Sequence, residues 1–129
     1  MSFTLKIFSF ILLLFLGCSI QEESICIKSP DENISVKILK QNSDYIYNVN
    51  FKGKPIIRDS KVGIMFKNNF EFPTSHNVKK VEKKFHKDTW ELPWGEKKVV
   101  KNIYNEIIIS FIDTNNLEAG KMLFRAYDD

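Results

Sequence analysis

Hydrophobic and polar residues alternate with a period of two over much of the chain beyond residue 24. Three segments show this alternation most clearly, at residues 34–38, 45–51 and 61–66. A period of two places successive side chains on opposite faces of a strand, so each segment predicts a half-buried β-strand. No stretch of ten or more residues has the spacing of an amphipathic helix. The pattern therefore predicts an all-β protein.

Turn-forming residues separate the predicted strands. Clusters rich in Ser, Pro, Asn, Asp and Gly occur at residues 29–31, 42–44, 52–55 and 68–69, and these residue types favour turns. Residues 122–127 alternate again and predict a further strand. Short strands joined by close turns are typical of an antiparallel sandwich or barrel. We therefore predict an antiparallel β-sandwich.

The longest predicted strand begins near Lys98 and runs to Ile112. Its second half, residues 107–112, is apolar on both faces apart from Ser110, as expected for a central strand that is covered on both sides. Its first half carries polar residues on both faces. Because binding loops of sandwiches lie at strand ends, we expect a site near this polar half.

Residues 7–16 form an apolar run, interrupted only by Ser9, which is followed by Gly17 and Cys18. The run is shorter than the ~20 apolar residues that cross a bilayer, and it has the length of the apolar part of a signal peptide. The Gly-Cys pair resembles the end of a bacterial lipobox, where cleavage precedes a lipidated cysteine. We predict a lipoprotein signal peptide at residues 1–17, lipid on Cys18 and a tether at residues 18–24.

Lipidation of Cys18 implies an exported chain anchored to the outer membrane, on its periplasmic or cell-surface side. The acidic pair Glu22-Glu23 resembles the surface-export signal of Bacteroides-type lipoproteins. An ordinary signal peptide with a chance cysteine is the alternative, and it allows a Cys18–Cys26 disulfide. If Cys18 carries lipid, we expect Cys26 to pack as a small apolar residue.

The formal net charge is +3, and residues 79–84 hold the densest group of lysines. A basic patch is one sign of nucleic-acid binding. These lysines, however, are interspersed with Val81 and Glu82 in a chain that we predict to be exported. We interpret the group as a solvated strand face and expect no nucleic-acid partner.

Residues 88–106 contain both tryptophans, a Trp-Gly-Glu turn and an Asn-x-Tyr-Asn-Glu run. An exposed indole offers a flat platform for a sugar ring, whereas a tryptophan in a small sandwich often fills a core or an interdomain contact. We predict an intermediate arrangement, a carbohydrate or interdomain face with some polar tips near a substrate cleft. The candidate residues are Trp90, Trp94, Glu96, Asn102, Tyr104, Asn105 and Glu106.

Five motifs follow one another along residues 25–129. They are Ser29-Pro30-Asp31, Tyr47-x-Val49-x-Phe51-x-Gly53-Lys54-Pro55, Asp88-x-Trp90-x-x-x-Trp94-Gly95-Glu96, Asn102-x-Tyr104-Asn105-Glu106 and Phe124-Arg125-x-Tyr127-Asp128-Asp129. Together they resemble the opening of the N-terminal domain of glycoside hydrolase family 97, a family of α-glucosidases and α-galactosidases. The chain departs from the family pattern at Ile103, where a histidine is common.

The resemblance implies a galactose mutarotase-like β-super-sandwich, incomplete in this chain, that packs in cis against a catalytic TIM barrel. It also implies that the catalytic carboxylates and the calcium-binding glutamates of the parent enzyme lie downstream of this region. For this chain we expect no catalytic residue, no cofactor and no metal. An α-glucoside or α-galactoside is the expected small-molecule partner, if there is one.

The carboxylates point to the same conclusion by themselves. Glycoside hydrolysis needs two carboxyl groups roughly 5–9.5 Å apart. Glu91 and Glu96 flank a proline-containing turn and are expected to be solvated, and the adjacent Asp128 and Asp129 must point to opposite faces of a strand. The leading hypothesis is a non-catalytic sandwich domain of an exported α-glycosidase. A freestanding carbohydrate-binding surface lipoprotein and a structural lipoprotein without sugar contact are the alternatives.

Overall fold

The computed structural model describes residues 24–96 and 98–128, and every regular element in them is a β-strand. The strands are β1 (Ser24–Lys28), β2 (Ile34–Gln41), β3 (Asp44–Phe51), β4 (Lys54–Val62), β5 (Ile64–Met65), β6 (Glu71–Phe72), β7 (Asn77–Glu91), β8 (Val99–Ile112) and β9 (Glu118–Tyr127). These residues contain no helix of the length and apolarity that a membrane crossing requires. The all-β prediction is confirmed.

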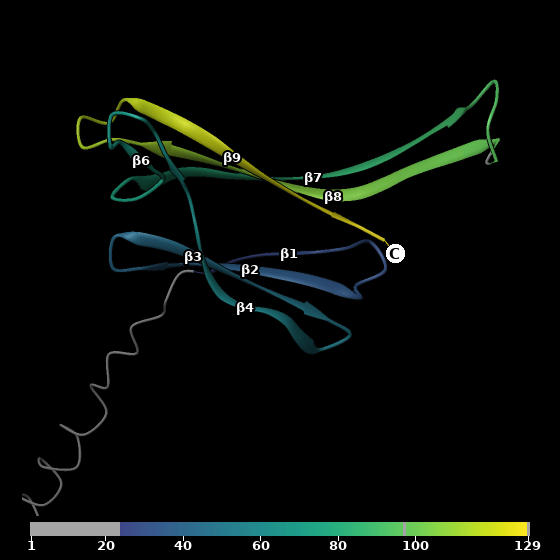
Figure 1. Cartoon of the computed structure of the whole chain (residues 1–129), viewed down its shortest axis with the longest axis horizontal. Coiled ribbons are helices and arrows are strands. Elements are labelled where there is room, and N and C mark those ends of the chain that lie inside the picture. Colours follow the sequence, from purple (N-terminus) through teal and green to yellow (C-terminus); the bar gives the residue numbers. More distant parts are fainter. Residues whose placement is uncertain (1–23, 97, 129) are drawn as a thin grey trace, which may run out of the picture.

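The strands form two main antiparallel sheets that lie face to face as two layers (Figure 1). The first sheet has the order β1-β2-β3-β4, the second has the order β7-β8-β9, and β5 and β6 form a small hairpin between them in sequence. Strands β1 and β2 pack against β8 and β9. The predicted antiparallel sandwich is therefore present.

The turn between β3 and β4 is shorter than predicted. Lys52 and Gly53 both have positive φ, 47° and 77°, and Phe51 pairs directly with Lys54. A two-residue loop with positive φ at both positions is a type I′ hairpin turn, whose twist matches the adjoining strands. Lys54 and Pro55, predicted to belong to the turn, therefore begin β4.

The prediction of a single strand at residues 61–66 is wrong, because this segment contains the end of one strand and the whole of another. Strand β4 ends at Val62 and β5 begins at Ile64, with Gly63 between them. A Cβ atom at Gly63 would lie 3.0 Å from the backbone oxygen of Phe72, so the close approach of the two chain segments favours glycine. Val62 packs against the core, while Ile64 is exposed.

The core lies between the two sheets and is dominated by β8. Ile107, Ile109 and Phe111 are completely or almost completely buried, and the Phe111 ring lies edge-on to Tyr45 at 5.1 Å between centroids. This confirms the predicted burial of the inner face of the strand. On the outer face, Ile108 is only partly buried, so the predicted cover on both sides is incomplete.

Cys26 corrects another prediction, since its side chain is exposed and not packed in the core. It alternates with Ile25 and Ile27, which face the second sheet as part of the core and its margin, so the thiol must point to the opposite face. Cys26 forms no disulfide within the described residues. The predicted signal peptide and Cys18 lie outside these residues, whereas Ser24, assigned to the tether, already belongs to β1.

Candidate functional site

The β7–β8 hairpin extends well beyond the first sheet at one end of the sandwich (Figure 1). Its pairing is continuous from Asn77 opposite Ile112 to Glu91 opposite Val99, apart from a bulge near Val78. The Leu92 N–H donates to the Lys98 oxygen at 2.9 Å and closes the loop. The hairpin thus carries the tryptophan segment away from the core.

The end of this hairpin is apolar and exposed. We define the hairpin tip as Trp90, Leu92, Trp94 and Val99. Trp94 is 83% exposed and Trp90 is 44% exposed, so neither indole fills the core of the described chain. Leu92 and Val99 are also more than a third exposed.

The predicted site residues do not form one surface. Trp90, Asn102, Tyr104 and Glu106 are on the outer face of the second sheet, as the pairing register requires. Asn105 faces inward and donates from Nδ2 to the Lys28 oxygen at 2.9 Å, which links the two sheets. Trp94 and Glu96 lie in the loop of the hairpin. The structure therefore brings only part of the predicted set together.

An outer-face cluster surrounds Tyr104. We define it as His86, Tyr104, Glu106, Arg125 and Tyr127. The Tyr104 ring stacks on His86 at 4.6 Å and lies 4.8 Å from the Tyr127 ring, and the Arg125 guanidinium lies 5.1 Å from the centre of the Tyr104 ring. These contacts bury Tyr104 on a face that is otherwise largely solvated.

Glu106 is the buried carboxylate of this cluster. Arg125 Nε donates to Glu106 Oε2 at 2.7 Å, and His86 Nε2 lies 3.7 Å from Glu106 Oε1. The hydrogen bond from Arg125 lowers the pKa of Glu106, while burial acts in the opposite direction. A carboxylate held in its ionised form by arginine is suited to anchoring a structure and not to donating a proton.

The outer-face cluster contains no second carboxylate, so it lacks the pair that glycoside hydrolysis uses. Elsewhere in the described part of the chain, no three His, Cys, Asp or Glu side chains are placed to hold a metal ion.

His86, Arg125 and Tyr127 were missing from the predicted site. Their role depends on register, since His86 is opposite Tyr104 in β7 and Tyr127 is opposite Tyr104 in β9. Arg125 is likewise opposite Glu106. The signal in the sequence was the Phe124-Arg125-x-Tyr127 motif, but only strand pairing connects it to the Asn-x-Tyr-Asn-Glu run.

The family model described as Glycosyl-hydrolase 97 N-terminal matches residues 27–129. This chain belongs to that family. The match begins within β1 and includes β2 to β9, and with them the hairpin tip and the outer-face cluster.

Solved structures support the same assignment. A glycoside hydrolase family 97 enzyme from Pseudoalteromonas sp. strain K8, in complex with acarbose, is 30% identical, with a TM-score of 0.71 over 81% of this chain and 16% of that chain. A variant of the same enzyme in complex with panose has the same values. A β-arabinopyranosidase structure, 17% identical, covers 81% of this chain and 17% of its own with a TM-score of 0.69, which shows a shared fold. The chain thus spans about a sixth of the length of these enzymes.

Proposed function

We propose that this chain serves as a non-catalytic N-terminal β-sandwich domain of an exported α-glycosidase, where it supports a catalytic barrel and borders a carbohydrate site. The observation that carries the proposal is the hairpin tip, whose apolar side chains lie beyond the sandwich and are exposed. An apolar surface of this kind becomes stable when a partner covers it. Family membership makes the barrel of a glycosidase the natural partner.

The carboxylates favour a supporting role. Glu106 is committed to Arg125, and Glu96 is exposed in the hairpin loop. Neither has the arrangement of an acid and a nucleophile across one glycosidic bond. The catalytic groups of the parent enzyme are therefore assigned to the barrel.

The test of a supporting role is an activity assay of the full chain with p-nitrophenyl α-glucoside and p-nitrophenyl α-galactoside. We expect no turnover above the buffer rate. Turnover that is abolished by Glu96→Gln or Glu106→Gln would overturn the proposal, because it would place a catalytic carboxylate in this chain.

A second candidate function is carbohydrate binding by the chain alone. The nearly fully exposed Trp94 ring favours it, since a flat indole accepts the apolar face of a pyranose. Calorimetric titration with maltooligosaccharides separates the two functions. Micromolar binding that is lost in Trp94→Ala, but kept in a Leu117→Ala control at another exposed apolar position, would favour the second function. If the leading proposal is correct, we expect no heat of binding from the parent chain or from either variant.

Export by a lipid anchor is part of the proposal and rests on the Gly17-Cys18 pair after the apolar run. In a Bacteroides-type host, radiolabelled fatty acid should be incorporated into the chain and should remain with the outer-membrane fraction. Cys18→Ala should abolish labelling, whereas Cys26→Ala should leave it unchanged. Labelling that survives Cys18→Ala would contradict the assigned anchor.

A further inference from the structure

The free edge of β1 and the inner face of β7 border an open seam between the two sheets. Strand β1 is the first strand in the order of its sheet, and it packs against β8 and β9. Neighbouring strands lie about 4.8 Å apart, so the next position beyond β1 lies over β7 and the adjoining side of β8. No described residue occupies this position, which we call the β1 seam.

Two hollows follow each other along the β1 seam. The larger, of about 550 Å³, is lined by Ile27 on β1, Phe85 on β7 and Asn105 on β8, among others. The smaller, of about 200 Å³, lies between Ile25 on β1 and Val78 and Val81 on β7. We call these two hollows the groove of the β1 seam; one lies beside Ile27 and the other beside Ile25.

The groove is apolar on the β7 side. Val78 is 37% exposed, Val81 is 38% exposed and Phe85 is 60% exposed. Their partners across the β7–β8 ladder, Phe111, Ile109 and Asn105, face the interior. Residues with this orientation are normally buried in a sandwich, because both inner faces contribute to the core.

The edge of β1 also offers backbone groups for pairing. The bond from Ser29 N to Ile34 O, 2.9 Å long, fixes which residues of β1 exchange hydrogen bonds with β2. In an antiparallel ladder these alternate, so Ile27 bonds to β2 while the N–H and C=O of Cys26 point to the open edge. The Lys28 oxygen on this edge already accepts from Asn105. An added strand would therefore pair mainly through Cys26.

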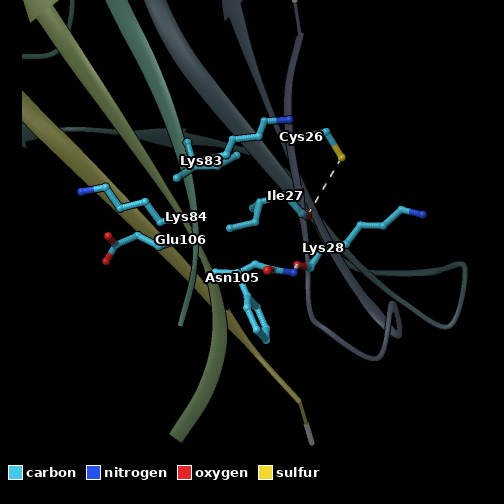
Figure 2. Close-up of a pocket in the computed structure, with 9 residues that line it drawn as sticks. Cys26, Ile27, Lys28, Lys83, Lys84, Asn105 and Glu106 are labelled. Atoms are coloured by element: carbon cyan, nitrogen blue, oxygen red, sulfur yellow. Dashed lines mark hydrogen bonds between the residues drawn. The ribbon is translucent and has the colours of Figure 1, made fainter. Parts of the chain in front are cut away.

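The charge of the groove is positive. Lys83 lies on the inner face of β7 and lines the larger hollow. Lys87 and Lys101 lie further along the inner faces of β7 and β8, toward the hairpin tip. None of the three makes an ion pair with a described residue, whereas Lys84 and Glu106 point away from β1 (Figure 2). The one carboxylate on the inner face of β7 is Glu91, at the far end of the hairpin.

We propose that the β1 seam binds an extended peptide segment that pairs with β1 and turns apolar side chains and a carboxylate toward β7. The side chains of the peptide that face β7 are expected to be apolar, acidic and apolar in turn. This order complements Val81, Lys83 and Phe85, which are apolar, basic and apolar along the inner face of β7. Main-chain pairing gives such a strand its affinity, and the alternate side chains give it specificity. This inference does not depend on the proposed glycosidase partner.

The test titrates the isotope-labelled full chain with the peptide Thr-Val-Thr-Glu-Thr-Val-Thr and follows amide signals by NMR. We expect saturable shifts at Cys26, Lys28, Val81 and Phe85. A matched peptide with lysine in place of glutamate should bind about tenfold more weakly, since an attractive pair with Lys83 becomes repulsive.

Two variants make the experiment decisive. Cys26→Pro removes the N–H at the open edge while leaving the β1–β2 ladder intact, so it should abolish binding, and Cys26→Thr should not. Lys83→Glu should reverse the preference between the two peptides, whereas Lys67→Glu, on the β5–β6 turn, should not. If Cys26→Pro fails to fold, the Lys83→Glu result decides.

Three results would overturn the proposal. They are equal binding of both peptides, binding unaffected by both Cys26→Pro and Lys83→Glu, and no binding at all. A concentration-dependent dimer of the chain that Cys26→Pro abolishes would also overturn it, because the occupant would then be a second copy.

Discussion

Lys52 and Gly53 reverse the chain between β3 and β4, and both have positive φ. A residue with a Cβ atom pays roughly 1–2 kcal/mol for the left-handed region, and glycine does not. A Cβ built at Gly53 would have no neighbour within 4 Å. Glycine is therefore favoured at position 53 because of its positive φ, and not because a side chain would clash with its surroundings.

We expect Gly53→Ala to lower the free energy of unfolding by about 1–2 kcal/mol. Urea denaturation followed by circular dichroism measures the change. Lys54→Ala, at the next and exposed position, is the control and should remain within about 0.5 kcal/mol of the parent chain. Equal stability of Gly53→Ala and the parent would contradict the assigned turn.

Glu106 gives a prediction about pH. Its pKa is lowered in the folded chain, mainly by the Arg125 hydrogen bond. A carboxyl group with a lowered pKa contributes stability above its unfolded pKa, and this contribution is lost as the pH falls through the folded pKa.

Glu106→Gln should therefore have a lower Tm than the parent at pH 7, and the difference should shrink as the pH falls below about 4.5. Thermal melts between neutral and strongly acidic pH measure this difference. Glu96→Gln, at an exposed position in the hairpin loop, should match the parent throughout. A Tm difference for Glu106→Gln that is independent of pH would argue against the ion pair.

At the scale of elements, alternation located β2, β3, β8 and β9 correctly from the sequence. These strands have one face in the core, so burial itself imposes the period of two. Strand β4 was missed because nearly all of its residues are exposed, and an exposed edge strand needs no apolar face. The break at Gly63 was missed because its cause is Phe72, a residue distant in sequence.

The same substitution, isoleucine to alanine, can be made on both faces of β8, and the two losses of stability can then be compared. Ile109 is fully buried between the sheets, whereas Ile108 is partly buried on the outer face. Ile109→Ala should cost about 2–5 kcal/mol of unfolding free energy, and Ile108→Ala should cost no more than about half as much. Chemical denaturation of both variants checks this, and the reverse order would mean that the faces are assigned incorrectly.

At the scale of the molecule, the hairpin tip and the β1 seam are two separate apolar surfaces that the sandwich leaves open. The tip is at the projecting end of β7 and β8 (Figure 1), and the seam runs between β1 and β7. A domain that folds around one core usually covers its apolar surface more completely. Both surfaces are therefore suited to contacts with other parts of a larger assembly.

The proposed contact between the tip and a barrel leads to a binding prediction. The catalytic region of the Pseudoalteromonas enzyme, produced without the segment that matches this chain, should bind the chain in calorimetry. Trp94→Ala should weaken binding by about thirtyfold, as expected for a central aromatic anchor worth about 2 kcal/mol. Leu117→Ala should leave the affinity unchanged, and an equal loss in both variants would contradict a specific role for the tip.

The sequence by itself determined that this chain is all-β, where most of its core strands lie and which family it belongs to, because these depend on local alternation, turn chemistry and short motifs. Strand β1, which contributes Ile27 to the core, was not among the predicted strands. It also singled out Tyr104 and Glu106. Only the tertiary structure decided that Asn105 joins the sheets, that Cys26 is exposed, and that Arg125 and His86 surround Glu106. The physical reason is that strand register and sheet packing bring together residues that are distant in sequence, and no local pattern encodes which of them will meet.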